Sequence, residues 1–468
     1  MRYISTRGRA PVLEFNDVLL TGLARDGGLY LPESWPQFDA AEIRAMRGLP
    51  YAELAARVIA PFTSGQIAPS DLTAILHESY RDFGHEAVAP LRQLESNLWV
   101  MELFHGPTLA FKDFALQFLG RAFDHVLRRR GKRITIVGAT SGDTGPAAIE
   151  ACRDRDAIDI FFLYPKGRVS PVQRRQMTTV DAANVHAIAI EGNFDDCQDL
   201  VKAMFNDTVF RDELRLSAAN SINWARIMAQ IVYYFHAAVA LGAPDRAVSF
   251  AVPTGNFGNI YAGYAARAMG LPIDQFIAGA NVNDILPRFF ATGALRAMAV
   301  TPTISPSMDI QISSNFERFL FELYVRDGAA TESALTEFRA SGTLDVGDNL
   351  WQKARETFDG YRLDDDETRS VIGDIHAADG YLLDPHSAIG VAAARARRRD
   401  PATPIVALAT AHPAKFPDAV QAASGVFPEL PPALADLHDR PERFDVLPND
   451  LGEIEAYIRA NVSAPGAA

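Results

Sequence analysis

The sequence predicts an α/β protein built on parallel sheets. From about residue 134 onward, apolar segments of strand length alternate with helical patterns, and several of these segments lead into Gly, Ser, Thr or Asn before the next helix begins. The chain has 468 residues, which is enough for roughly two or three domains. We therefore expect two parallel-sheet α/β domains and an N-terminal, mostly helical domain, with functional loops at the carboxyl ends of the strands.

The N-terminal part of the chain has a different pattern. The turn-rich segment 26–36 (DGGLYLPESWP) precedes two segments with helical patterns, 51–60 and 70–83. Strand-like alternation is weak in this part. We assign residues 1–95 to the N-terminal, mostly helical domain.

Six apolar segments are the predicted strands. They lie at 134–139, 159–165, 185–190, 248–253, 276–281 and 404–410. The apolar stretch 227–243 is shorter than a bilayer requires and contains Gln230 and His236, so it predicts a buried or amphipathic helix. We assign residues 131–230 to a small α/β domain, and residues 96–130 together with 231–430 to a large α/β domain.

The last part of the chain departs from this rhythm. Residues 300–370 contain two helical stretches and an acidic run, and we interpret them as an insertion in the large domain. Residues 431–468 are expected to form a C-terminal extension. It contains a last helix near 450–461, and we expect the final SAPGAA segment to be frayed.

Composition excludes several classes of protein. The chain has 45 Lys and Arg against 58 Asp and Glu, a net charge of −13, and no long basic run, which argues against nucleic-acid binding. Cys152 and Cys197 have neither CxxC spacing nor neighbouring Cys/His clusters, which excludes a disulfide scaffold and a thiolate metal site. The N-terminus lacks a secretory signal, and no segment is long and apolar enough to anchor in a membrane. We expect a cytoplasmic protein with no metal.

One lysine stands between aromatic residues. Lys112 lies between Phe111 and Phe114 at the predicted start of a helix, in the segment HGPTLAFKDFALQ. Burying an ammonium group costs free energy unless the group is paired or neutralised. Lys112 is therefore either a side chain whose charged end reaches solvent, or a desolvated amine with a lowered pKa, which is what imine formation with a carbonyl cofactor requires.

A glycine-rich segment follows the predicted strand 248–253. In TGNFGN, residues 254–259, Gly255 and Gly258 allow the backbone to approach an anion, and the amides at the helix N-terminus supply donors. A tight turn made only for packing is the alternative. The segment matches neither the GK[ST] pattern of nucleotide phosphate loops nor the dinucleotide pattern GxGxxG.

A second loop of this kind is GATSGDTG, residues 138–145. Its polar residues Ser141, Asp143 and Thr144 either cap the following helix or form a receptor for a carboxylate. Ser141 does not stand in GxSxG, and no partner histidine and aspartate can be assigned, which disfavours a hydrolase triad.

Polar residues also follow the last predicted strand, in ATAHPAKFP, residues 409–417. Thr410, His412 and Lys415 stand at the carboxyl end of a buried strand, where ligand-facing residues collect in open α/β sheets. Taken singly, each of them is more often structural than catalytic. Their coincidence with the other loops favours a common site.

Together these segments closely resemble the threonine synthase family of pyridoxal-phosphate enzymes, which have the tryptophan-synthase-β fold, or fold type II. The resemblance rests on six motifs in the order and spacing of the family: DGGLYLP, FHGPTLAFKDF, GATSGDTGPAA, SPVQRRQM, VPTGNFGN and TAHPAKF. It covers most of the chain and is closest to the form with an N-terminal helical domain and an extra segment after residue 300. It implies that the cofactor is pyridoxal 5'-phosphate.

The resemblance also implies roles for individual residues. Lys112 would bind the cofactor covalently and act as the catalytic base. Thr410 would face the pyridine nitrogen. Related enzymes often have Asn where Asp143 stands, so which group hydrogen-bonds the cofactor's 3′-oxygen stays open. The cofactor's phosphate would be held by Gly255, Asn256, Phe257, Gly258 and Asn259.

The implied reaction converts O-phospho-L-homoserine and water into L-threonine and phosphate, by elimination at Cγ and addition of water at Cβ. We assign the substrate carboxylate to Ser141, the backbone of Asp143 and Thr144. Cations and hydroxyls are suitable partners for the substrate phosphate. The residues we expect there are Lys415, Arg174, Ser313 and Asn315.

Other interpretations remain open at this point. A related phospho-lyase would release a keto acid instead of threonine, and a non-catalytic phosphate-binding module would use Lys112 only structurally. Residues 1–95 could also be a partner-binding module unrelated to catalysis. We expect a small-molecule substrate, no nucleic acid or membrane partner, and a monomer or homodimer. Because the net charge is negative, we expect anions to bind in a small electropositive cleft lined by Lys112 and the amides of 255–259.

Overall fold

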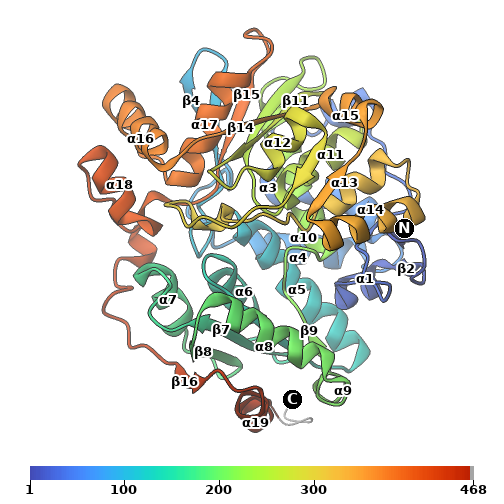
Figure 1. The fold of residues 1–468 in the computed structure, drawn as a ribbon, viewed down its shortest axis with the longest axis vertical. Helices are drawn as coiled ribbons and strands as arrows, with labels where there is room; N and C mark the ends of the chain where they lie inside the picture. The colour runs from blue at the N-terminus through green and yellow to red at the C-terminus, as the bar shows by residue number, and fades with distance from the viewer. Residues whose placement is uncertain (464–468) are drawn as a thin grey trace.

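A computed structural model describes residues 1–463 and has two main sheets, one in the upper and one in the lower part of the molecule (Figure 1). The upper sheet has six strands in the order β14-β11-β10-β15-β5-β4 and is parallel except for β4. The lower sheet has five strands in the order β16-β8-β7-β6-β9, and all of its pairs are parallel. The predicted α/β fold with parallel sheets is confirmed.

Each of the six predicted strands is present. The observed bounds are β6 Ile134–Ala139, β7 Ile158–Pro165, β8 Val185–Glu191, β10 Val248–Pro253, β11 Ile273–Ala280 and β15 Ile405–Ala409. Strands β7, β10 and β15 are buried along their whole length. This burial explains why they read as unbroken apolar runs, because helices cover both faces of a parallel sheet.

The N-terminal part is mostly helical, with a small antiparallel sheet in which β1 (Arg2–Ser5) pairs with β2 (Leu13–Glu14) and β3 (Tyr30–Pro32). The predicted helices are α3, Tyr51–Thr63, and α4, Pro69–Tyr80, and they follow the short helices α1 (Phe15–Thr21) and α2 (Ala40–Arg44). Buried residues such as Leu54 and Phe62 join these helices to the main core. The N-terminal part therefore packs onto the large domain.

Helices α11 (Gly258–Ala268), α12 (Ile285–Thr292) and α17 (Pro385–Arg397) pack directly on the six-stranded sheet, and other helices surround them. Among these are α5 (Lys112–Arg130), α10 (Trp224–Ala240) and α16 (Asp365–Asp379). Helix α10 is buried along most of its length, as expected from its apolar sequence. In the described part of the chain, no helix combines the length and apolarity needed to cross a membrane.

The segment predicted as an insertion contributes more to the fold than two helices. It contains α13 (Phe316–Leu323), α14 (Gly328–Ser341) and α15 (Asp348–Arg355), and its β13 (Thr343–Asp345) pairs with β12 (Ala294–Arg296). It also supplies β14, Phe358–Arg362, an edge strand of the six-stranded sheet. The sequence FDGYR has a single fully buried residue, Phe358, so hydropathy does not reveal this strand.

Two further strands lie outside the domains predicted for them. Strand β4, Leu91–Glu95, falls in the predicted N-terminal domain but pairs antiparallel with β5, Leu98–Glu102, in the large sheet. The predicted C-terminal extension supplies β16, Asp445–Pro448, which adds to the small sheet beside β8. Both strands are short and largely exposed, which hides them from a search for apolar runs.

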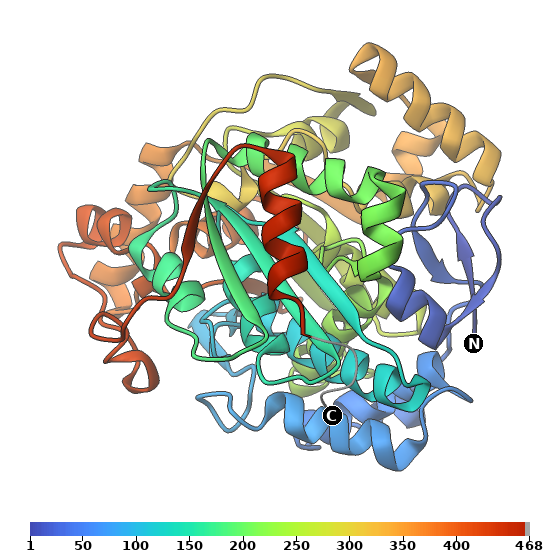
Figure 2. The same cartoon turned by 90° about the horizontal axis from the view of Figure 1, so that it is seen from below.

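The last helix, α19 (Leu451–Asn461), lies across the five-stranded sheet, where Figure 2 shows it in red in front of the strands. Its Ile454 and Ile458 pack with Phe161 and Ile188 of that sheet. The other helices of this part are α6 (Thr144–Cys152), α7 (Pro171–Thr178), α8 (Phe194–Asn206) and α9 (Thr208–Leu214), and the edge strand is β9 (Leu216–Ser217). Of the SAPGAA segment predicted to fray, residues 464–468 lie outside the described residues.

Candidate active site

The predicted loops meet at the carboxyl ends of the strands. Phe111 N donates to Thr410 O at 2.9 Å, and Ala110 forms an isolated antiparallel bridge with Ala411. The segment that carries Lys112 is therefore fastened to the segment that follows β15. The loop 140–144, after β6 of the small sheet, lies on the other side of Lys112.

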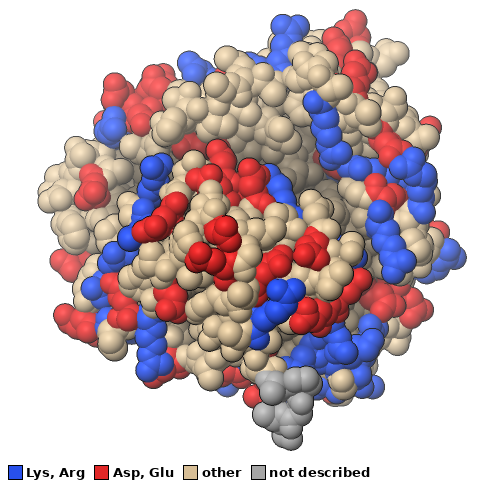
Figure 3. Space-filling view, turned by 60° about the horizontal axis from the view of Figure 1, so that its bottom comes forward, with Lys and Arg blue, Asp and Glu red and all other residues tan. Residues whose placement is uncertain are grey.

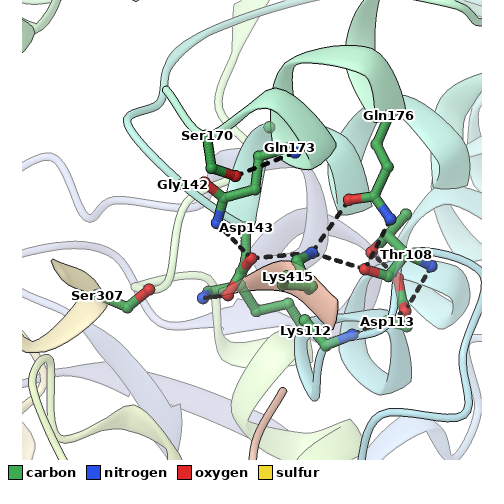
Figure 4. Close-up of polar contacts among 12 residues, drawn as sticks. Thr108, Lys112, Asp113, Gly142, Asp143, Ser170, Gln173, Gln176, Ser307 and Lys415 are labelled. Carbon is green, nitrogen blue, oxygen red and sulfur yellow. Dashed lines mark hydrogen bonds and ion pairs between the residues drawn. The ribbon is translucent and has the colours of Figure 1, made fainter. Parts of the chain in front are cut away.

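Lys112 is the first residue of α5, and its side chain is only 12% exposed. Its Nζ lies 3.3 Å from Asp143 Oδ2 (Figure 4). Burial lowers the pKa of Lys112, and the nearby cations Lys415 and Arg226 lower it further, while Asp143 opposes them. Of the two sequence interpretations of this lysine, the geometry favours the desolvated amine.

Lys415 is completely buried, in the short 3₁₀-helix Pro413–Lys415. Its Nζ lies 2.6 Å from Thr108 O, 2.9 Å from Asp143 Oδ1 and 3.1 Å from Gln176 Oε1. An ammonium group has three donors, and these three acceptors use all of them. In this structure all three donors of Lys415 therefore face protein acceptors, and its role as a ligand of the substrate phosphate stays a prediction.

Asp143 is held by both lysines. Its Oδ1 also accepts a hydrogen bond from Gln173 Nε2 at 2.8 Å. Burial alone would raise the pKa of Asp143, but Lys415 and Lys112 hold it well below its usual range, so the carboxylate is ionised. Asp143 stands before the first residue of α6 but makes no side-chain capping bond to that helix, so the capping interpretation does not apply to it.

The turn before Lys112 depends on Asp113. Its Oδ2 accepts from Thr108 N at 2.9 Å and its Oδ1 from Thr108 Oγ1 at 2.6 Å. Burial raises the pKa of Asp113 to about 6. A Cβ on Gly106 would lie 2.4 Å from the Cβ of Asp113, so only glycine fits at position 106. The FHGPTLAFKD motif thus encodes a compact turn that aims Lys112 into the site.

The glycine-rich loop offers a row of amides to a ligand. Among residues 1–463, no acceptor is found for the backbone N–H groups of residues 255–259. Phe257 has a φ of 61°, in the left-handed region, and precedes the first residue of α11. Free amides at a helix N-terminus favour an anion, so this loop fits a phosphate group.

The same loop has little room for larger residues. A Cβ on Gly255 would lie 3.0 Å from Ser307 O, and a Cβ on Gly258 would lie 3.1 Å from Asn315 Nδ2. Asn259 is buried, and its Oδ1 accepts from Tyr233 and Tyr234, while its Nδ2 has no partner in the described part of the chain. This unpaired donor and the five free amides meet the requirements of the phosphate of pyridoxal phosphate.

Two residues predicted to bind the substrate phosphate hydrogen-bond to this loop. Ser313 Oγ donates to Gly255 O. Asn315 donates to Asn256 O from both its backbone N and its Nδ2, each at 3.1 Å, and it is fully buried. The predicted fourth ligand, Arg174, pairs through Nη2 with Glu442 Oε1 at 2.8 Å. Ser313 and Asn315 are therefore engaged by the protein itself, whereas Arg174 keeps a buried Nε with no partner among residues 1–463.

The loop 140–144 also carries free donors. Thr140 Oγ1 accepts from the amides of Gly142, at 3.2 Å, and Gly145, at 3.1 Å, which shapes the turn. Within residues 1–463, the amides of Ser141, Asp143 and Thr144 have no acceptor. These amides are available to a carboxylate, as the sequence predicts for this loop.

Thr410 and His412 have different environments after β15. Thr410 is buried, and its backbone N donates to Ser387 Oγ at 3.0 Å, while its own hydroxyl takes part in no hydrogen bond among the described residues. This hydroxyl is available to a cofactor nitrogen. His412 instead accepts from Ala414 N through Nδ1 at 3.2 Å, and burial lowers its pKa to about 4, so it is a neutral structural cap.

Arg226 is a candidate functional residue that the sequence analysis missed. It lies in the first turn of α10 and is buried, and burial lowers its pKa to about 10. Its Nη1 donates to Ala219 O at 3.2 Å, but its Nε has no partner, and no carboxylate of residues 1–463 pairs with it. An arginine within an apolar helical run, with no acidic residue nearby in sequence, was the available signal.

The surface charge is not uniformly negative. On the face shown in Figure 3, Lys and Arg side chains stand among Asp and Glu side chains around a hollow. Positive charge at the site comes from the partly buried Lys112 and the buried Lys415 and Arg226. The local cations, and not the net charge of −13, provide for anion binding.

Three family profiles match successive parts of the chain. "Threonine synthase N terminus" matches residues 2–80, "Pyridoxal-phosphate dependent enzyme" matches residues 84–338, and "Threonine synthase, C-terminal" matches residues 387–458. The middle match contains Lys112 and the glycine-rich loop, and the last one contains Thr410 and Lys415.

Individual relatives match over nearly the whole length. A threonine synthase from Pseudomonas aeruginosa is 60% identical over 98% of both chains. The crystal structure of a threonine synthase from Brucella melitensis with pyridoxal phosphate bound is 59% identical, with a TM-score of 0.98 over 99% of this chain and 100% of that one. A yeast threonine synthase structure is 39% identical, with a TM-score of 0.93 over 98% of both chains.

Proposed function

The chain belongs to the threonine synthase family and is a pyridoxal-phosphate-dependent enzyme, and we propose that its substrate is O-phospho-L-homoserine, which it converts with water into L-threonine and phosphate. The observation that carries this proposal is the buried amine of Lys112 between an ionised carboxylate and the free amides of the glycine-rich loop. We also propose the role of each side chain in the site.

Lys112 would hold the cofactor, and residues 255–259 would hold its phosphate. Pyridoxal phosphate, when bound, supplies an electron-withdrawing ring that acidifies the substrate carbon next to the amino group. The hydroxyl of Thr410 would face the ring nitrogen. An uncharged hydroxyl does not stabilise a protonated ring nitrogen as a carboxylate would, so the ring withdraws electrons less strongly.

Lys112 would also be the base that moves protons on the substrate. Its lowered pKa leaves more of the amine unprotonated near neutral pH. In the overall reaction, the Cγ–O bond breaks and phosphate leaves with the electron pair. A hydroxyl from water joins Cβ, Cβ gives up a proton, and Cγ takes up a proton to become a methyl group. A single amine that reaches these neighbouring carbons accounts for the proton transfers.

Arg226 is the residue we propose for the substrate phosphate. It is a buried guanidinium with a free Nε donor and no carboxylate partner among residues 1–463, and such a group is costly to bury unless an anion neutralises it. Of the residues that the sequence suggested for this role, Lys415, Ser313 and Asn315 hydrogen-bond to other protein groups, and Arg174 has a free Nε but is already paired with the Glu442 carboxylate. For the substrate carboxylate we retain Ser141, the backbone of Asp143 and Thr144, supported by their free amides.

The test is product analysis with O-phosphohomoserine, phosphoserine and homoserine. We expect threonine and phosphate in equal amounts from O-phosphohomoserine alone. A keto acid in place of threonine would identify the related phospho-lyase, and no turnover with a colourless protein would identify a non-catalytic module. Lys112→Ala should abolish both the cofactor's visible absorbance and turnover. The exposed Lys132→Ala is the matched control and should retain both.

We further propose that the enzyme works in the cytoplasm as a monomer or homodimer, without nucleic-acid, membrane or metal partners. Its two cysteines are both free and buried, which suits a reducing compartment. Sedimentation of the purified protein with cofactor would distinguish the two assembly states.

A further inference from the structure

A buried carboxylate outside the site accepts four hydrogen bonds. Asp384 precedes helix α17 and is completely buried. It accepts from the backbone N–H groups of His386, at 2.9 Å, and Ser387, at 3.1 Å. It also accepts from His386 Nδ1 at 2.7 Å and from Ser387 Oγ. A carboxylate offers about four lone-pair positions, so every position of Asp384 is used by the two residues that open the helix.

Through Ser387, the hydrogen bonds of Asp384 continue to the segment that carries Lys112. Because the Ser387 hydroxyl gives its hydrogen to Asp384, its oxygen is left to accept, and Thr410 N donates to it at 3.0 Å. Thr410 O in turn accepts from Phe111 N at 2.9 Å, immediately before Lys112. Both backbone polar groups of Thr410 are thereby fixed, one by Ser387 and one by Phe111.

Through His386, the hydrogen bonds of Asp384 continue to the Ser307 loop, which packs on the glycine-rich segment. Since His386 Nδ1 donates to Asp384, Nε2 is the acceptor, and Ser307 N donates to it at 3.3 Å. Ser307 stands in the 3₁₀-helix Pro306–Met308. A Cβ on Gly255 would lie 3.0 Å from Ser307 O, and a Cβ on Gly142 would lie 3.7 Å from Ser307 Oγ. Ser307 therefore lies close to both ligand loops, near Gly255 and Gly142.

We propose that Asp384 is a positioning residue that holds two walls of the active site in register, Thr410 through Ser387 and the Ser307 loop through His386. This inference rests on the proposed function, because the ligands of the two walls are the cofactor and the substrate. The hydrogen bonds to Asp384 in the described part of the chain come from His386 and Ser387. Asp384 acts by fixing the hydroxyl orientation of Ser387 and the tautomer of His386, both of which must accept a backbone N–H.

Three variants separate the two branches. Ser387→Ala removes the acceptor of Thr410 N, His386→Leu removes the acceptor of Ser307 N, and Asp384→Asn disturbs both. His386→Gln is the conservative variant, since its amide can donate to Asp384 and accept from Ser307 N. Asp364→Asn is the matched control, because Asp364 caps the neighbouring helix α16 and contacts neither wall.

The first readout is hydrogen exchange of the full-length protein, with and without pyridoxal phosphate, in peptides that cover 303–310 and 406–412. We expect Ser387→Ala to speed exchange only in 406–412, His386→Leu only in 303–310, and Asp384→Asn in both. His386→Gln should restore the protection of 303–310. Asp364→Asn should leave both peptides unchanged.

The second readout is kinetic. Ser387→Ala should weaken binding of pyridoxal phosphate about tenfold and shift its absorbance, whereas His386→Leu should mainly raise the KM for the substrate, also about tenfold, as is usual for groups that orient a ligand. Uniform loss of protection in all variants, or an Asp384→Asn protein that behaves like Asp364→Asn, would overturn the proposal. A wild type that fails to bind pyridoxal phosphate would instead overturn the proposed function, and the exchange pattern is independent of that result.

Discussion

Lys415 Nζ lies 2.9 Å from Asp143 Oδ1, and both side chains are almost completely buried. Asp143 follows β6 of the five-stranded sheet, whereas Lys415 follows β15 of the six-stranded sheet, so this ion pair joins the two parts of the molecule (Figure 1). If the cofactor takes up the amine of Lys112, Lys415 is the remaining cation beside Asp143. The pair therefore links the two sheets at the site and neutralises the Asp143 carboxylate.

Lys415→Met should destabilise the protein by about 3 kcal/mol, because it leaves the Asp143 carboxylate buried without its main partner. Urea unfolding of the cofactor-free protein would measure the loss. The double variant with Asp143→Asn should recover part of the lost stability, since burying a neutral amide costs less free energy than burying a carboxylate. A Lys415→Met protein that unfolds like wild type and shows only a raised KM for the phosphorylated substrate would restore Lys415 as a substrate ligand.

Arg226→Gln should raise the KM for O-phosphohomoserine at least about tenfold, because the variant loses a charge-assisted partner of the phosphate. Binding of pyridoxal phosphate should change much less. Steady-state kinetics and a cofactor titration on the same preparation would separate the two effects. The surface variant Arg369→Gln, which removes an exposed arginine of α16, serves as the control. Parallel loss of cofactor and substrate binding would contradict the assignment.

Gly255→Ala should weaken cofactor binding about tenfold, or roughly 1.4 kcal/mol. The added Cβ would lie 3.0 Å from Ser307 O and from Ile310 Cδ1, so the loop and its free amides must shift from their present position. Fluorescence titration with pyridoxal phosphate would measure the change. Gly452→Ala is a suitable control, since a Cβ there would make ordinary contact with Asp450 at 3.4 Å.

The pH dependence of stability should contain a contribution from Asp113. Burial raises the pKa of this carboxyl to about 6, above the value of about 3.9 in an unfolded chain. Between these two values the folded protein binds more protons than the unfolded chain, so this contribution to stability is fully present below pH 4 and is lost as the pH rises to 6. The loss is on the order of 3 kcal/mol.

Asp113→Asn should remove this dependence. Urea unfolding of wild type and variant at pH 4, 5, 6 and 7 gives the test, because only the difference between the two proteins isolates residue 113. We expect the variant to gain stability relative to wild type as the pH rises from 4 to 6. A constant difference over this range would show that Asp113 titrates at the same pH in the folded and unfolded chain.

Strands and loops were predictable where local sequence determines the structure. Strands such as β7 and β10 are buried on both faces and read as continuous apolar runs, and the glycines of the loop before α11 mark a backbone that approaches other groups closely. By contrast, β14 and β16 are edge strands with few buried residues. Their pairing depends on the neighbouring strand already being in place, which hydropathy does not report.

The sequence motifs of the site were predictable, but the hydrogen-bond partners of its side chains were not. Lys112 stands in an unusual aromatic context that local sequence reveals, and the loops lie at strand ends. The partners of Lys415 are residues 108, 143 and 176, which are far from it in sequence. That all three of its N–H donors have acceptors is therefore visible only in the tertiary structure. Arg226 was missed for the same reason, since a single arginine in an apolar helix has a meaning only when its surroundings are known.

The return of the chain to β8 has a consequence for synthesis on the ribosome. The small sheet is assembled from residues 134–217 and from 445–448, so β8 keeps an unpaired edge until nearly the entire polypeptide has emerged. An open strand edge can pair with another nascent chain. The last translated strand and helix thus complete the small sheet only at the end of synthesis. A ribosome that stops before β16 would release a product whose β8 edge is unpaired and prone to aggregation. If it stops before β15, the product would also lack Thr410 and Lys415.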